Sequence, residues 1–167
     1  DASVGGKTAI DYAGAKNLIG TFNPAQDVLI SSDVLRTLSE SEYISGLGEV
    51  LKHAILSDNE DLYNFLVNNK DKVLNRDRAT VTEMVKLSIA VKNNYIERDP
   101  EEKKGIRSAL NLGHTFAHAL ESITHFSGIS HGKAVAWGCG RAFEASYELG
   151  LIDEAFYKKV SSLFEMY

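Results

Sequence analysis

The stretch Ser39–Leu56, SESEYISGLGEVLKHAIL, carries the clearest fold signal in the sequence. Ser39, followed three residues later by Glu42, forms a capping box, the pattern that marks the start of a helix. Apolar residues then recur at intervals of three and four, which is the period of one buried helix face. They are Tyr43, Ile44, Leu47, Val50, Leu51, Ala54 and Ile55. We therefore predict a helix at about 40–57.

The same spacing extends over most of the remaining sequence. It predicts helices at about 59–68, 77–98, 107–124, 132–149 and 153–166. Pro100 ends the helix at 77–98, because a residue before proline avoids the helical region. In residues 1–20, four glycines together with Lys7 and Lys16 predict a flexible basic loop, and residues 27–31 then predict a short strand. The expected fold class is mainly α, with one helical domain over residues 21–167.

The composition is that of one globular domain and excludes several functions. The sequence has 167 residues, of which 44% are hydrophobic and 25% charged. A net charge of −5 without a block of Lys or Arg argues against a nucleic-acid partner. The apolar runs are too short to span a membrane, and the one cysteine, Cys139, favours a reducing, cytoplasmic location. Because residue 1 is not Met and the last helix has no stop signal, we expect a fragment of a longer protein.

The segment Arg107–Glu121, RSALNLGHTFAHALE, is the most informative about chemistry. If it is one helix, five polar residues fall within an arc of about 80° and apolar residues occupy the opposite face. The five are Arg107, Asn111, His114, His118 and Glu121. A stripe of Arg, Asn and His offers hydrogen-bond donors and imidazoles, whereas a solvated face usually carries Glu and Lys. The alternative is a polar outer face with incidental histidines.

Two histidines four residues apart can bind a divalent metal from one helix face, so His114 and His118 form a candidate pair. A third ligand is needed, and both His131 and Glu49 are candidates. Glu49 stands three residues before Lys52, a spacing that also fits an ordinary helix ion pair. His53 is either a further ligand or a satisfied histidine. Gly5, Gly6 and Lys7 resemble the end of a P-loop, but Asp1 occupies the place of its first glycine, which leaves a basic glycine loop suited to an anion.

Five segments taken in order resemble the 3-dehydroquinate synthase family. They are DASVGGKT at 1–8, GAKNLIG at 14–20, GLGEVLK at 46–52, LNLGHTFAH at 110–118 and HGKAV at 131–135. The resemblance implies the C-terminal, mostly helical domain of a two-domain α/β plus α enzyme. Residues 1–20 would lie at the cleft between the domains, and a NAD-binding domain would precede residue 1. The family converts 3-deoxy-D-arabino-heptulosonate 7-phosphate into 3-dehydroquinate and phosphate in the shikimate pathway, with NAD that is consumed and regenerated.

The resemblance also implies a role for particular residues. It makes Glu49, His114 and His131 the ligands of a zinc or cobalt ion, which moves His118 to the substrate side. The implied substrate contacts are Lys7, Lys52, Arg107, Asn111 and His118, with Asp1, Asn17 and Lys92 nearby. Gly5, Gly6 and Lys16 would lie toward NAD. A phosphate and a carboxylate need several Lys and Arg donors, and these residues supply them.

Departures from the family and rival interpretations remain. Lys133 stands where the family usually has Glu, beside His131, and the sequence contains no dinucleotide-binding fingerprint. Other sugar-phosphate cyclases, such as 2-deoxy-scyllo-inosose synthase, share the ligands; Arg107 favours a substrate with a carboxylate. Metal-dependent alcohol and glycerol dehydrogenases lack the stripe, and a non-catalytic helical module would bind no metal. We expect the whole protein to form a homodimer and the isolated chain to be inactive.

Overall fold

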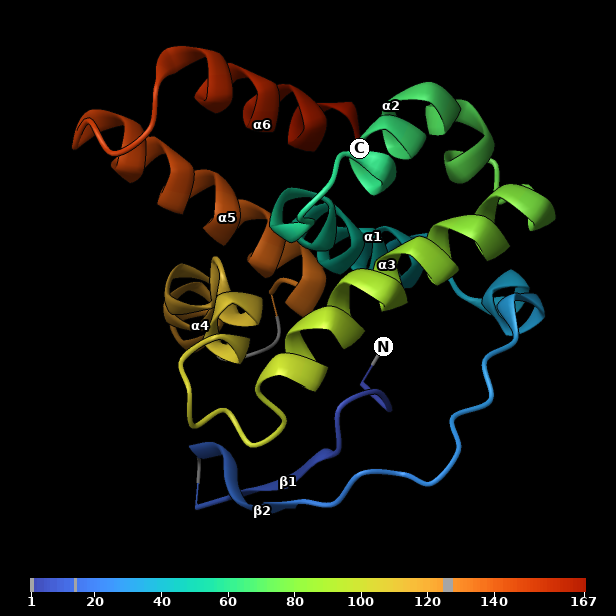
Figure 1. Ribbon diagram of the computed structural model, residues 1–167, viewed down its shortest axis with the longest axis vertical. Helices are drawn as coiled ribbons and strands as arrows, with labels where there is room; N and C mark the ends of the chain where they lie inside the picture. The colour runs from blue at the N-terminus through green and yellow to red at the C-terminus, as the bar shows by residue number, and fades with distance from the viewer. Residues whose placement is uncertain (1, 14, 125–127) are drawn as a thin grey trace.

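The computed structural model describes residues 2–13, 15–124 and 128–167 and confirms the mainly α fold class. A β-hairpin comes first, and helices follow (Figure 1). The elements are β1 (Lys7–Tyr12), β2 (Ala15–Phe22), the 3₁₀ helix η1 (Ser32–Thr37), α1 (Glu40–Leu56), α2 (Asp61–Leu74), α3 (Arg78–Arg98), the 3₁₀ helix η2 (Arg107–Asn111), α4 (His114–Ile123), α5 (His131–Glu148) and α6 (Glu154–Met166). None of the helices in these ranges is long and apolar enough to cross a membrane.

Helix α1 is the centre of the helical body, as its sequence predicts. Ser39 caps it, because the Ser39 hydroxyl accepts the backbone N–H of Glu42 at 3.2 Å. Its apolar face packs in a core cluster with α2, α3 and α6, where Leu66 and Leu163 are fully buried. A second cluster joins α4, α5 and α6 around Ala117, Val135 and Val160. Burial of these two faces is the main force that holds the helices together.

Helices α1 and α5 cross with almost no space between their backbones. The Gly132 N–H donates to the Ser45 hydroxyl at 3.1 Å. A Cβ atom on Gly132 would lie 1.7 Å from the Ser45 carbonyl oxygen, and a Cβ on Gly48 would lie 2.1 Å from the Gly132 carbonyl oxygen. The crossing therefore needs glycine on both helices. It places Glu49, next to Gly48, opposite His131, next to Gly132.

Two predictions for the N-terminal region are wrong. Residues 2–13 and 15–20 do not form a flexible loop, because β1 and β2 form an antiparallel hairpin in which Ile10 pairs with Ile19; Asp1 and Gly14 lie outside the described residues. Their backbone groups satisfy one another, yet β1 is exposed on both faces, so its residues show no buried period from which a strand could be predicted. Residues 27–31 do not form a strand, since the sheet in the described part of the chain consists of β1 and β2 alone.

The predicted single helix at 107–124 is also wrong. It is broken between η2 and α4 at Gly113, whose φ of 78° is left-handed. Gly113 packs directly on α5, where a Cβ would lie 2.7 Å from the sulfur of Cys139. The buried face of α4 therefore contains Ala117 and Glu121, whereas Phe116 and Ile123 are exposed. The five polar residues of Arg107–Glu121 thus do not share one helix face. Helix α2 has a kink at Asn69, where φ is −125° and ψ is 20°, next to the predicted end near 68. It then continues to Leu74, and Val73 in this second part is fully buried.

Candidate metal and anion site

Three side chains from three helices converge at one point. Glu49 comes from the middle of α1, and His114 and His131 are the first residues of α4 and α5. One ligand atom from each lies within 4.8 Å of the others. The Nε2 atoms of His114 and His131 are 3.9 and 3.6 Å from Glu49 Oε1. One carboxylate and two imidazoles form a donor set that suits a divalent ion such as zinc, with a position open for a further ligand.

The other ring nitrogen of each histidine and the second carboxylate oxygen of Glu49 contact groups outside the three-residue cluster. His114 Nδ1 lies 3.2 Å from the Leu112 carbonyl oxygen, and His131 Nδ1 lies 3.1 Å from Glu121 Oε1. Because both partners are acceptors, each Nδ1 donates its proton to them, so the Nε2 atoms, which face Glu49, are the ring nitrogens available to a metal. Lys52 Nζ donates to the other Glu49 oxygen, Oε2, at 2.6 Å. These contacts orient all three side chains, so the residues present fit a metal ion.

The charges of the group are consistent with ligands. Burial raises the pKa of Glu49, but its hydrogen bond with His131 and the Lys52 charge outweigh burial and hold the pKa well below its usual range. Burial and the Lys52 charge lower the pKa of His114. The hydrogen bond to Glu49 raises the pKa of His131. Glu49 is therefore ionised and His114 neutral near pH 7, which are the forms that bind metals, whereas His131 must release a proton when a metal binds.

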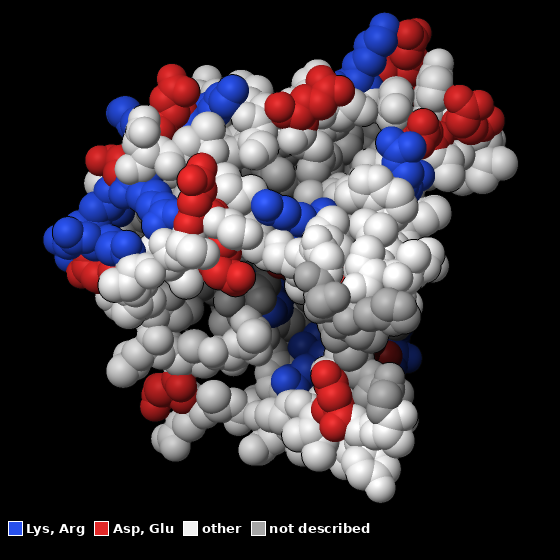
Figure 2. Space-filling model, turned by 180° about the vertical axis from the view of Figure 1, so that it is seen from behind, with Lys and Arg blue, Asp and Glu red and all other residues white. Residues whose placement is uncertain are grey.

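Cationic side chains gather next to these three residues. Lys52 and Arg107 are both only 3% exposed. The Arg107 guanidinium donates to the Pro100 carbonyl at 2.6 Å and to the Gly5 carbonyl at 2.7 Å. Burial, together with the charges of Lys52, Arg107 and Lys7, lowers the pKa of Lys92 to about 8. Seen from behind, the surface is hollowed, and Lys and Arg side chains collect in the hollow (Figure 2). Clustered like charges of this kind favour an anionic ligand.

Two carboxylates at the site had no role assigned to them from the sequence, although one of them, Glu121, had been placed in the polar stripe. Glu102 forms an ion pair with Lys7 and accepts the Asn111 side-chain amide at 3.1 Å. It lies in the run Glu101–Lys104, which has the composition of a solvated loop. Glu121 is 3% exposed and contacts His131. The sequence feature that indicated Glu121 is its position seven residues after His114, because this spacing is two helical turns along the same helix face.

The other predicted residues are distributed around this centre. His118 is exposed beside His114, with ring centroids 5.5 Å apart, and among the described residues it does not belong to the three-residue group. The Asn17 N–H donates to Asp11 Oδ1 within the hairpin. Gly5 and Gly6 have φ angles of 104° and 66°, which form a tight turn. Asp1 and the side chain of Lys16 lie outside the described residues.

His53 was predicted to be either a further metal ligand or a histidine with its hydrogen bonds satisfied, and the structure shows the second. Its Nδ1 lies 2.8 Å from the Ser88 hydroxyl, and it is 1% exposed. Burial and the charge of Lys52 lower its pKa to about 3, so it is a neutral core residue.

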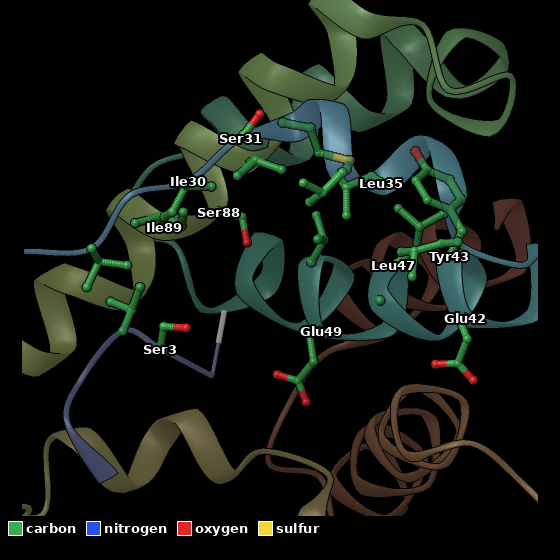
Figure 3. Close-up of a pocket in the computed structure, with 18 of the residues that line it drawn as sticks. Ser3, Ile30, Ser31, Leu35, Glu42, Tyr43, Leu47, Glu49, Ser88 and Ile89 are labelled. Carbon is green, nitrogen blue, oxygen red and sulfur yellow. The ribbon is translucent and has the colours of Figure 1, made fainter. Parts of the chain in front are cut away.

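A groove of about 420 Å³ runs beside the centre, between α1, α3 and residues 28–38. Its walls are mostly apolar and include Ile30, Leu35 and Leu47. Figure 3 shows Glu49 at its edge, with the carboxylate pointing away from these side chains. The distances from Glu49 to His114 and His131 show that this direction leads to α4 and α5. The groove and the polar centre therefore lie on different sides of α1.

Two models of known sequence families together match the whole chain. The family model described as 3-dehydroquinate synthase C-terminal matches residues 46–167, and the model described as 3-dehydroquinate synthase N-terminal matches residues 1–45. A 3-dehydroquinate synthase of Francisella tularensis subsp. tularensis is 44% identical over 154 residues, which are 92% of this chain and 42% of that protein. A bifunctional 3-dehydroquinate synthase/phosphatase of Fusobacterium nucleatum is 40% identical over all of this chain and 25% of that protein. The chain thus spans less than half the length of these curated relatives.

Solved structures show the same fold. A 2-epi-5-epi-valiolone synthase from Streptomyces hygroscopicus, with NAD+ and Zn2+ bound, superposes with a TM-score of 0.87 at 23% identity, over 99% of this chain and 46% of that chain. A 2-deoxy-scyllo-inosose synthase complexed with carbaglucose-6-phosphate, NAD+ and Co2+ gives a TM-score of 0.85 at 23% identity, over 99% of this chain and 45% of that chain. At this identity the likeness shows the fold alone.

Proposed function

Because the chain belongs to the 3-dehydroquinate synthase family, we propose that the protein containing it converts 3-deoxy-D-arabino-heptulosonate 7-phosphate into 3-dehydroquinate and phosphate. The observation that carries this proposal is the position of a Glu–His–His group beside a cluster of buried cations. The group is suited to the hydroxyl oxygens of a sugar, and the cations are suited to its phosphate and carboxylate.

Glu49, His114 and His131 are the proposed metal ligands, and zinc or cobalt is the proposed ion. When bound, the ion supplies Lewis-acid polarisation of a substrate hydroxyl, and NAD supplies reversible hydride transfer. The protein's own contribution is the fixed direction of the ligands. Leu112 and Glu121 set the two imidazole rings, and Lys52 holds the second carboxylate oxygen of Glu49.

Lys7, Lys52, Lys92 and Arg107 are the proposed anion contacts. Hydrogen bonds to two carbonyl groups already fix the plane of the Arg107 guanidinium. A guanidinium has five N–H groups, so the N–H groups that these carbonyls do not use can bind a carboxylate. A fixed and buried cation binds an anion more strongly than an exposed one, because water screens it less. Asn111 and His118 offer hydrogen-bonding groups on the exposed side, and we assign them to substrate hydroxyls.

Residues 1–45 are proposed to contact a nucleotide-binding part of the longer protein. They match the N-terminal family model, and many exposed apolar side chains fall within them. These include Ile10, Leu18, Ile19, Leu29 and Ile30, of which Leu29 is 97% exposed. A surface of this kind marks a contact with another domain or protein. It would place residues 1–20 at a domain cleft, with Gly5, Gly6 and Lys16 toward NAD, ahead of the helical metal- and substrate-binding domain at 21–167. Homodimerisation and a cytoplasmic location remain predictions from the sequence.

The experiment is turnover by the full-length protein with zinc and NAD, followed by phosphate release. We expect release from 3-deoxy-D-arabino-heptulosonate 7-phosphate and none from a sugar phosphate that lacks a carboxylate, such as glucose 6-phosphate. Arg107→Ala should lower kcat/KM by roughly 10- to 100-fold or more, because charged hydrogen bonds contribute about 1.5–3 kcal/mol each. Arg98→Ala, which removes an exposed arginine at the end of α3, is the matched control.

Two results would overturn the proposal. Turnover of the sugar phosphate without a carboxylate would assign the protein to another group of cyclases. A variant lacking Arg107 with parental kcat/KM would remove this residue from the site. Residues 1–167 alone should release no phosphate, because they contain no glycine-rich turn between a strand and a helix that could seat NAD.

A further inference from the structure

One buried carboxylate, Asp99, shapes the loop between α3 and η2. Asp99 follows the last residue of α3 and is 1% exposed. Its Oδ1 atom accepts the backbone N–H groups of Lys103 and Lys104 at 2.8 and 3.0 Å. Its Oδ2 atom accepts those of Ile106 and Arg107 at 3.0 and 3.1 Å. Four backbone bonds on one side chain therefore close the loop 100–107 on itself.

This loop carries two of the charged side chains at the anion cluster. Arg107 has its own N–H bound to Asp99, and its guanidinium turns back to the Pro100 carbonyl. Glu102 donates its N–H to the Asp99 carbonyl at 3.2 Å, and its side chain contacts Lys7 and Asn111. The backbone of Glu102 is left-handed, with a φ of 57°, a conformation that a non-glycine residue holds only when its surroundings impose it. Glu102 lies within the loop that the hydrogen bonds of Asp99 close.

We propose that Asp99 is a positioning residue of the anion site, which acts by holding Arg107 and Glu102 in place and does not itself touch the ligand. The inference rests on the proposed function in one respect, that the cluster binds the anionic groups of the substrate. Burial alone would raise the pKa of Asp99, but the four backbone hydrogen bonds outweigh it and keep the pKa below its ordinary value. The residue is therefore an ionised acceptor at both oxygens.

Asp99→Asn is the sharpest perturbation, because it preserves size and removes one acceptor. An amide has one oxygen, so its NH₂ group would face either the pair Lys103 and Lys104 or the pair Ile106 and Arg107, and two bonds would be lost. Asp99→Glu is the second variant, since it keeps the charge but moves the carboxylate by one methylene. Asp77→Asn is the matched control, because Asp77 caps the other end of α3 through Thr80.

The first measurement is steady-state kinetics of the full-length protein. In Asp99→Asn we expect KM for the phosphorylated substrate to rise at least about tenfold, with a smaller change in kcat and the same zinc content as the parent. In an Arg107→Ala background the same substitution should change KM by a smaller factor, because one of the two residues through which it acts is gone. Asp77→Asn should lower thermal stability without changing KM. An equal KM effect in both backgrounds, or the same KM shift from Asp77→Asn, would overturn the inference.

The second measurement is independent of turnover. Hydrogen exchange of the segment 100–107 should accelerate in Asp99→Asn and Asp99→Glu relative to the parent and to Asp77→Asn. Inorganic phosphate, titrated by calorimetry, should bind more weakly to both variants than to the parent. Unchanged exchange would refute the role of Asp99 whatever the enzyme does. Faster exchange and weaker phosphate binding in a protein that fails to release phosphate from the proposed substrate would support Asp99 and reject the proposed function.

Discussion

The crossing of α1 and α5 offers the most direct test of how the fold builds the metal site. Replacing Gly132 with alanine adds one methyl group, whose Cβ would start 1.7 Å from the Ser45 carbonyl oxygen. Real Cβ atoms are essentially never closer than 3.0 Å to such an atom. The two nearest atoms, the carbonyl oxygen and carbon of Ser45, belong to the backbone, so rotation of a side chain cannot relieve the clash. The helices must therefore separate by at least about 1 Å.

The size of the effect follows from this displacement. Overpacking of a tight contact costs about 1–3 kcal/mol of unfolding free energy. The metal site is more sensitive, because ligand distances tolerate only about 0.2 Å of change. His131 precedes Gly132 directly and lies 3.6 Å from Glu49 across the crossing. We therefore expect Gly132→Ala to weaken zinc binding by at least the roughly 10- to 100-fold typical of a lost supporting contact.

The assay is a zinc titration against a competing chelator, combined with urea unfolding of the zinc-free protein. Gly140→Ala is the matched control, since it changes the same helix at a position where a Cβ meets open space. It should leave zinc affinity unchanged and raise stability by about 0.5–1 kcal/mol, because alanine is the better helix former. Parental zinc affinity and stability in Gly132→Ala would refute the argument that this close approach sets the ligand geometry.

Three further predictions concern single side chains. His131→Ala should lose zinc on dialysis while His118→Ala retains it, as measured by elemental analysis; the reverse outcome would assign the metal to the pair on α4. Glu121→Gln should weaken zinc binding by about tenfold in the same chelator competition, because a neutral amide holds the His131 N–H less strongly; unchanged affinity would show that Glu121 does not orient His131. The pKa of His53 is about 3 in the folded protein and 6.5 ordinarily. Between these pH values the His53 side chain therefore binds a proton in the unfolded state but not in the folded state. Stability should therefore fall by about 1.4 kcal/mol per pH unit from this group as the pH drops toward 4, and His53→Asn should remove that slope in urea unfolding; identical slopes in both proteins would contradict this.

The candidate site shows where sequence reasoning stops. The spacing of His114 and His118 suggested a metal pair because neighbours on one helix can be identified without a structure. The spacing left Glu49 and His131 as alternatives, and only the resemblance to a family joined them. They meet through the contact between Gly48 and Gly132, two glycines 84 positions apart, and such a contact leaves no local pattern. The supporting carboxylates Glu102 and Asp99 were missed for a related reason, since each has the polarity expected of a solvated position, and Glu121 was placed in the polar stripe without a role.

By itself, the sequence determined the helical class, the capped start of α1 and most of the helices. These depend on the period of apolar residues and on caps, which act within a few residues. Tertiary structure decided the rest. The hairpin at 7–22 depends on pairing between strands, and the break at Gly113 depends on the fit of α4 against α5. The site is the extreme case, because its ligands come from three helices and their separation is set by how closely two backbones approach. Local preferences contribute tenths of a kcal/mol to about one each, whereas a backbone clash costs about 1–3 kcal/mol, so packing decided wherever the two conflicted.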